Sequence, residues 1–358
     1  RHYRFMLEGL KETQRALHDR GIGMVVQLGS PDEVAVRLGE DASLIVCDRG
    51  YLRHQKQWRK IVARRAGCRV VQVESDVVVP VDTVSSKAEY AARTIRPKIH
   101  RLLPIFLTGI RPAAVRRSSL KLPQHGLELQ RPDVLLGKLS IDRSVAPVSF
   151  IYRGGTQAAK KRFADFLKKG LKDYDRHGNQ PQTDDISHMS MYLHFGQISP
   201  LYLALQVKKA KRAGEDNRSA FLEQLIVRRE LAMNFVHQTP DYDTYQSLPR
   251  WARQTLEDHQ SDRRQHTYTR RQLEKAATHD PYWNAAMEEM KVTGFMHNYM
   301  RMYWGKKILE WSKTPKQAFK TTLALNNKYF VDGRDPNSYT GVAWIYGLHD
   351  RPWVERPI

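Results

Sequence analysis

The sequence has few cysteines and no apolar run long enough to cross a membrane. Cys47 and Cys68 are its only cysteines in 358 residues, and they form no CxxC pair. Two isolated thiols exclude a disulfide scaffold and favour an intracellular, reducing compartment. The chain also lacks a signal-peptide pattern, so we expect no association with a membrane.

Several catalytic and cofactor-binding motifs are missing as well. No predicted strand is followed by GxGxxG, which argues against a standard NAD site, and the chain has no P-loop and no GxSxG. There are 14 histidines, but no HExxH motif and no cysteine–histidine cluster. His188 and His194 are six residues apart and would not share a helical face. We therefore expect no metal site.

What the chain has in excess is positive charge. Its 59 basic and 38 acidic side chains give a formal net charge of +21, and 41% of its residues are hydrophobic. The hydrophobic content predicts a globular protein, and the length predicts about two domains. The charge favours a polyanionic partner, with nucleic acid ahead of an acidic membrane surface, although it could also serve solubility alone. Tryptophan and tyrosine accompany the charge, which suits a surface that stacks bases.

The periodicity of the chain predicts two different halves. Residues 1–109 alternate helical patterns with buried-strand candidates at 24–29, 43–48 and 69–80, which favours an α/β, Rossmann-like parallel sheet. Because this half begins with a helix, we expect one strand to be lost upstream. Proline, arginine and glycine collect in residues 110–155, which we interpret as a linker. Residues 156–358 read as an all-α domain.

One helical stretch, MHNYMRMYWGKKILEW at 296–311, combines aromatic residues with an arginine. Trp304 and Trp311 are two turns apart on one stripe, and Arg301 precedes Trp304 by three positions on the same side. The alternative is a core stripe with an arginine at its edge.

Two other segments could complete a site. In ISHMSMYLHFGQIS, at 186–199, small hydroxyls precede a predicted helix start. This arrangement either binds phosphate or is an ordinary cap. In NNKYFVDGRDPNSY, at 326–339, Asn326, Asp332, Asp335 and Asn337 surround one turn. A buried arginine needs a carboxylate partner, and this turn supplies candidates for Arg301.

Six ordered blocks together carry a resemblance to a known family. They are YLHFGQIS, LIVRREL, YWNAAMEEM, MHNYMRMYWGKKILEW, LNNKYFVDGRDPNSYTGVAW and HDRPW. The chain resembles class II cyclobutane pyrimidine dimer photolyases over nearly its whole length. The resemblance implies an α/β domain followed by a helical FAD domain. It also implies repair of pyrimidine dimers, in which excited, fully reduced FAD gives an electron to a flipped-out dimer.

The resemblance assigns roles to residues around the flavin. Trp283, Trp304 and Trp311 match a relay that reduces the flavin, and Asn326 matches an asparagine facing flavin N5. Arg301 and Asp332 match an ion pair beside the flavin ring. The other expected cofactor contacts are Tyr174 at the cofactor's edge, Ser187, His188, Met189 and Ser190 at its phosphates, and Asp335 in the turn.

The residues implied for the lesion depart from the family pattern. Trp344 and Met302 match neighbours of the flipped dimer. Gln224 stands where relatives usually have a glutamate, and it keeps an acceptor but cannot share a proton with the dimer. Arg228 stands where some relatives have a tryptophan. In relatives, an arginine can pair with the aspartate that matches Asp350. Gly178 stands in place of that arginine here, and we expect Arg176 to take over its role.

The resemblance also implies partners. We expect UV-damaged double-stranded DNA as substrate, a monomer, and a cytoplasmic, nucleoid or nuclear location. An antenna pigment, deazaflavin or folate in relatives, would lie in the first domain, but no motif identifies it here. The alternative is a cryptochrome-like flavin photoreceptor without repair activity, and a third interpretation is a flavin-free nucleic-acid-binding protein.

Overall fold

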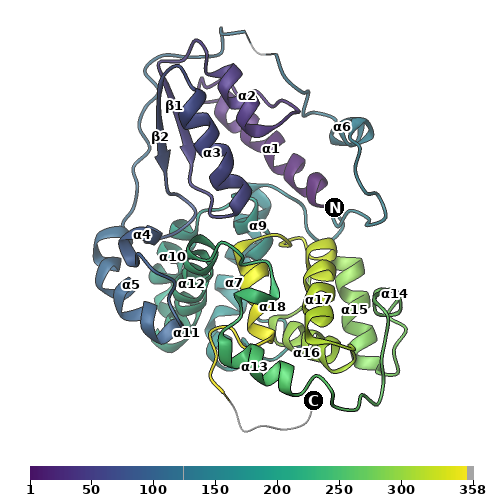
Figure 1. Ribbon diagram of the computed structural model, residues 1–358. Coiled ribbons are helices and arrows are strands. Elements are labelled where there is room, and N and C mark those ends of the chain that lie inside the picture. Colours follow the sequence, from purple (N-terminus) through teal and green to yellow (C-terminus); the bar gives the residue numbers. More distant parts are fainter. Residues whose placement is uncertain (124, 353–358) are drawn as a thin grey trace.

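The computed structural model describes residues 1–123 and 125–352, and Figure 1 shows a small α/β part above a larger helical part. The first part contains α1 (His2–His18), α2 (Pro31–Leu38), β1 (Leu44–Asp48), α3 (Arg53–Arg65) and β2 (Arg69–Val73). The connection that follows contains α4 (Val81–Val84), α5 (Ala92–Phe106) and α6 (Pro132–Lys138).

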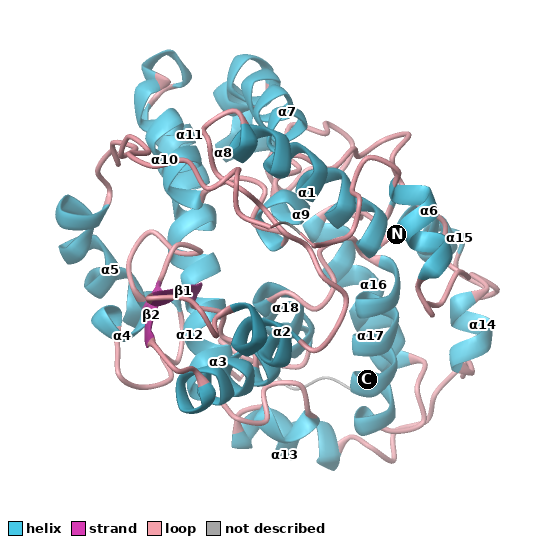
Figure 2. Cartoon of the chain, turned by 90° about the horizontal axis from the view of Figure 1, so that it is seen from above, coloured by secondary structure: helices cyan, strands magenta, loops and turns pink. Residues whose placement is uncertain are grey.

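All of the regular elements of the second part are helices in the described residues. It contains α7 (Thr156–Lys169), α8 (Tyr174–His177), α9 (Ser190–His194), α10 (Pro200–Lys209), α11 (Glu215–Leu222), α12 (Arg229–Gln238), α13 (Arg250–Asp258), α14 (Arg270–Glu274), α15 (Pro281–Thr293), α16 (Asn298–Glu310), α17 (Pro315–Tyr329) and α18 (Pro336–Ile345). A single π-helical turn, Glu223–Arg228, joins α11 to α12. Seen from above in Figure 2, the two short strands lie toward one side of the molecule, and their residues are half-exposed or exposed. The predicted order, α/β followed by all-α, is confirmed.

The sheet is smaller than the sequence pattern predicts. β1 and β2 pair in parallel, from Leu44 opposite Arg69 to Asp48 opposite Val73. The predicted strand at 24–29 does not form: the carbonyl oxygen of Val26 instead accepts a hydrogen bond from the N–H of Leu127, at 2.7 Å. An apolar run becomes a strand only when a neighbouring strand pairs with it, and here the connection takes that place.

The third predicted strand, 69–80, ends early, because β2 stops at Val73. Its continuation, Val77–Val79, is buried but irregular. The carboxylate Oε1 of Glu230 on α12 accepts hydrogen bonds from the N–H groups of Val78 and Val79, at 2.6 and 3.2 Å. A side chain of the helical part therefore satisfies backbone groups that a sheet ladder would otherwise pair. Val78 and Val79 share one hydrophobic cluster with α5, α10 and α12. The three-part division of the chain at 109 and 155 stays a prediction.

The helices that carry the site begin at strong capping sequences. Thr314, Asp280, Asp335 and Ser199 each accept a hydrogen bond from a backbone N–H two or three residues on, and each is followed by proline at the first helical position. A side-chain cap followed by proline fixes where a helix starts. In α17, Thr314 is the cap and Pro315 is the first helical residue. No helix in the described residues is long and apolar enough to span a membrane.

Replacing Thr314 with alanine removes the cap of α17. We expect Thr314→Ala to lower the free energy of unfolding by about 1 kcal/mol, because the N–H of Gln317 loses its acceptor. Urea denaturation measures this, with the exposed neighbour substitution Lys313→Ala as a control that should leave the midpoint unchanged. Equal effects of the two substitutions would show that the cap contributes nothing.

Candidate functional site

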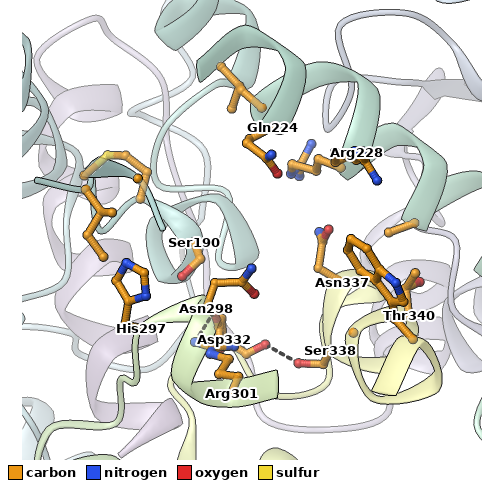
Figure 3. A pocket seen from close by; sticks show the side chains of 18 of the residues that line it. Ser190, Gln224, Arg228, His297, Asn298, Arg301, Asp332, Asn337, Ser338 and Thr340 are labelled. Carbon is orange, nitrogen blue, oxygen red and sulfur yellow. Dashed lines mark hydrogen bonds and ion pairs between the residues drawn. The ribbon is translucent and has the colours of Figure 1, made fainter. Parts of the chain in front are cut away.

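A cavity of about 560 Å³ opens in the helical part. Figure 3 shows Gln224 and Arg228 on one wall, Asn298, Arg301 and Asp332 on the other. The sequence-predicted residues that line it are Tyr174, Ser187, His188, Met189, Ser190, Gln224, Arg228, Arg301, Met302, Trp304, Asn326, Asp332, Asp335 and Trp344. Residues from distant parts of the chain therefore meet around one space, whose volume suits a cofactor-sized ligand.

The floor of the cavity is organised by the ion pair between Arg301 and Asp332. The two guanidinium nitrogens lie 3.2 and 3.1 Å from the two carboxylate oxygens. The Arg301 guanidinium carbon also lies 3.8 Å from the centre of the Phe330 ring. A bidentate pair fixes both side chains in one orientation, and it presents a charged, hydrogen-bonding surface to whatever occupies the cavity.

The turn after α17 supplies further polar groups. Asn326 is buried, and its amide donates to the side-chain oxygen of Asn327 at 3.1 Å. Asp335 caps α18 and lies 3.2 Å from Nδ1 of His194. Burial on its own would raise the pKa of Asp335, but the hydrogen bond and charge of His194 outweigh it, and the pKa lies below its ordinary value. Asp335 is therefore held as a carboxylate by its neighbours.

The segment before α9 has an unusual backbone. His188 and Asp184 both have positive φ, at 53° and 52°. The His188 ring lies between the Tyr152 hydroxyl and the Asp184 carboxylate, with 2.9 Å to each. Both ring nitrogens already have protein partners, so this side chain holds the segment in shape. Tyr174 also lines the cavity, and burial raises its pKa to about 12.

Several buried polar atoms on the wall have no hydrogen-bond partner in the described protein, among them Nε2 of His297, Nε1 of Trp304, Oγ1 of Thr340 and Nε2 of His349. Nδ1 of His297 accepts the N–H of Tyr299 at 3.2 Å, so a neutral ring carries its proton on Nε2. Burial lowers the pKa of His297, which favours that neutral form. Unpaired buried donors are costly, and a bound ligand with acceptor atoms would satisfy them.

Sequence reasoning missed His297. It lies in the same block as Arg301 and Trp304, but as the residue preceding α16 it resembles an ordinary cap. Only its burial, together with the free nitrogen, distinguishes it.

The three tryptophans form one row that starts at the cavity wall. Trp304 lines the cavity, and the Trp283 ring is stacked on it with 6.5 Å between centroids and 9° between planes. Trp311 contacts Trp283 at 5.6 Å, so Trp283 lies between the two tryptophans of α16. The indole N–H of Trp283 donates to the Trp304 carbonyl oxygen at 2.9 Å, which fixes this order.

The opposite wall carries the residues predicted to contact the lesion. The Arg228 guanidinium carbon lies 5.6 Å from the Trp344 ring centre, and its Nε lies 3.3 Å from Glu223. Arg96 of α5 binds the same carboxylate through two nitrogens, at 3.0 and 2.8 Å. Gln224 is exposed at the rim. The π-helical turn places both Gln224 and Arg228 on the cavity side, a frequent use of such turns.

Two expectations from the sequence have different outcomes. Arg176 does not take the place proposed for it beside Asp350, because it lies 3.5 Å from Asp173 within its own turn. The tryptophan of the block HDRPW, at position 353, lies outside the described residues.

Comparisons with known proteins agree with this architecture. Residues 1–117 match the family model described as DNA photolyase. The chain is 48% identical, over its whole length, to 78% of a deoxyribodipyrimidine photo-lyase from Methanothermobacter thermautotrophicus. It is 40% identical, over 99% of its length, to 72% of one from Oryza sativa subspecies japonica.

Solved structures with little sequence similarity share the fold. A cryptochrome from Synechocystis superposes with a TM-score of 0.76 at 16% identity, covering 99% of this chain and 73% of the other. A class III photolyase from Agrobacterium tumefaciens gives 0.74 at 17% identity, with the same coverage. The fold and the sequence identity of 48% and 40% to the two photo-lyases from Methanothermobacter and Oryza lead to one conclusion: the chain belongs to the deoxyribodipyrimidine photo-lyase family.

Proposed function

We propose that this chain is a class II photolyase that holds FAD in the cavity and repairs cyclobutane pyrimidine dimers in DNA. The observation that carries the proposal is the meeting of three features at one cavity: a bidentate ion pair, unpaired buried donors and a row of indoles. The names of relatives 38–48% identical to the chain support repair over photoreception. The ordered sequence blocks support the assignment to class II.

The lining residues fit FAD by their chemistry. Asp332 and Arg301 would lie beside the flavin ring, where Arg301 can donate to an electron-rich heteroaromatic edge. Asn326 would face flavin N5. The segment Ser187–Ser190 would receive the phosphates, with its hydroxyls and the exposed N–H groups at the start of α9. The Nε2–H of His297 would find an acceptor on the cofactor, which would satisfy a donor that the protein leaves unpaired.

When bound, FAD supplies the light-driven transfer of one electron to the dimer and its return; the residues bind, orient and insulate. Trp344 and Met302 would pack against the flipped dimer and exclude water from it. Gln224 would accept or donate a hydrogen bond at the base edge. Arg228, held against Trp344 by Glu223, would place a positive charge on the side of the pocket where the dimer gains negative charge.

The positive charge of the protein and the flipping of the dimer would both contribute to DNA binding. The net charge of +21 would attract the duplex and neutralise phosphates around the rim. Flipping the dimer out of the stack costs a few kcal/mol, and least where damage has already weakened pairing. An antenna pigment in the α/β part, and a monomeric state, belong to the same proposal.

Replacing Trp304, the indole at the cavity wall, tests the electron relay independently of repair. We expect Trp304→Phe to slow light-driven reduction of bound flavin about tenfold or more, equivalent to at least ~1.4 kcal/mol of activation free energy. Repair by chemically reduced enzyme should be unchanged, because the electron for the dimer does not cross the indoles. Absorption spectroscopy under blue light gives the first rate, and a dimer-repair assay gives the second.

Trp58→Phe is the matched control for this experiment, because Trp58 is half-buried on α3. It should leave both rates unchanged. Normal photoreduction by the Trp304 variant would exclude Trp304 from the relay.

Neutralising Asp332 tests the cofactor site. We expect Asp332→Asn to leave Arg301 without its counter-charge, lowering the free energy of unfolding by roughly 3 kcal/mol, and to reduce the flavin retained on purification. Denaturation in urea and the ratio of visible to ultraviolet absorbance measure the two effects. Asp216→Asn, an exposed carboxylate on α11, is the control. Full flavin content in the Asp332 variant would place the cofactor elsewhere.

A further inference from the structure

A second histidine on the cavity wall has a ring nitrogen without a partner. His349 follows α18 and lines the cavity, and its Nε2 is buried with no hydrogen-bond partner among the described residues. The turn that carries it folds back onto α18, where the N–H of Gly347 donates to the Trp344 carbonyl oxygen at 3.0 Å. The guanidinium of Arg228 is close enough to act on the charge of the imidazole. His349 therefore belongs to the wall predicted to contact the lesion.

The turn around His349 is fixed by contacts with a distant segment. Nδ1 of His349 lies 2.7 Å from the Tyr90 carbonyl oxygen, and the Tyr90 hydroxyl donates to the Asp350 carbonyl oxygen at 2.6 Å. The N–H of Glu89 donates to the side chain of Asn234 on α12 at 2.8 Å, which holds the segment before α5 in place. These contacts keep His349 at a positive φ of 61°, a conformation uncommon outside glycine. The position of the imidazole is therefore set by the fold.

The hydrogen bond to Tyr90 determines which ring nitrogen of His349 carries the proton. A carbonyl oxygen can only accept, so Nδ1 is the donor. Burial lowers the pKa of His349 to about 4, and the charge of Arg228 acts in the same direction, so the ring is neutral near pH 7. Nε2 therefore has a lone pair and is an acceptor. His297 has the opposite tautomer, since its Nδ1 accepts and its Nε2 donates.

The orientation and polarity of this acceptor are better defined than those of its neighbours. The Phe235 ring packs against the imidazole with 5.8 Å between centroids and 82° between planes, which limits rotation of the ring. Arg228 can only donate, and Gln224 is exposed and can turn either end of its amide toward a ligand. A ligand at this end of the cavity therefore meets a fixed acceptor at His349 and needs an N–H to pair with it.

A thymine dimer has a matching donor. Thymine is joined to deoxyribose through N1, so its one remaining N–H is at N3, and the cyclobutane ring uses only C5 and C6. We propose that Nε2 of His349 accepts a hydrogen bond from the N3–H of one base of the flipped dimer and selects thymine or uracil over cytosine at that position. This inference rests on the proposed function. The N3 of cytosine has a lone pair instead of a proton, so it would leave the buried acceptor unpaired.

The experiment compares dark binding of matched oligonucleotides by full-length, flavin-loaded protein. One duplex contains a thymine dimer, and two others contain the same dimer with a methyl group on N3 of the 5′ or the 3′ base. One of the two methyl groups should weaken binding to the wild type about tenfold through the loss of a buried hydrogen bond. Any effect of the methyl group on the DNA itself cancels, because each protein variant is tested with the same duplexes.

Two substitutions separate the acceptor from the turn. The amide of asparagine reaches the position of Nδ1, and that of glutamine reaches the position of Nε2. His349→Asn should therefore keep the bond to Tyr90 but bind the unmethylated dimer about tenfold more weakly, and the methyl group should no longer matter. His349→Gln should keep most of the selectivity. Tyr90→Phe, which removes only the hydroxyl bond to Asp350, is the control for loosening of the turn and should discriminate as the wild type does.

Nitrogen-15 NMR in the dark gives an independent measurement. Without DNA, His349 should carry its proton on Nδ1. The Nε2 resonance should shift when the unmethylated dimer binds, but not when the duplex with the disruptive methyl group binds. Flavin content should be the same in the wild type and in all three variants.

The outcomes separate the two proposals. A methyl effect of equal size in the wild type and in His349→Asn would overturn the role of His349 and leave the proposed repair function intact. Loss of flavin from His349→Asn with unchanged selectivity would place the acceptor beside the cofactor and also overturn the inference. A wild type that binds dimer-containing DNA no better than undamaged DNA would overturn the proposed function, and this inference with it.

Discussion

The site depends on the position of α16. This one helix carries Arg301 and Met302 on the cavity floor, Trp304 at its wall, and leads to Trp311 outside it. The ion pair from Arg301 to Asp332 fixes the helix against the turn after α17, and the hydrogen bond from Trp283 to the Trp304 carbonyl fixes it against α15. A shift of α16 would displace the cofactor contacts and the first electron-transfer step together.

Much of this arrangement could be predicted from the sequence because the strongest signals are local. The helical stretch at 296–311 follows from spacing, and the need to pair a buried charge points from Arg301 to the turn at 326–339, where only the resemblance selects Asp332. The resemblance then supplied the grouping of residues far apart in the chain. The cavity brings together all of the expected flavin and lesion residues, although their roles stay predictions.

The remainder depends on contacts that no local pattern encodes. The spacing of Trp304 and Trp311 suggests a direct step, but the Trp283 ring from another helix lies between them. Residues 24–29 have the composition of a strand, yet the only described partner for the Val26 carbonyl is the connection near Leu127. His297 carries no motif, and its significance comes from its burial at the cavity wall and from which ring nitrogen already has a partner. In each case the deciding fact is a tertiary neighbour.

Gln224 and Arg228 mark where this chain differs from the expected family pattern, and both lie on the π-helical turn at the rim of the cavity. The direct test of the account is therefore repair itself. Purified protein with chemically reduced flavin should restore the ultraviolet absorbance of thymine when illuminated with dimer-containing DNA, and it should not do so in the dark. A protein that carries reduced flavin and binds this DNA but restores no absorbance under light would contradict the account.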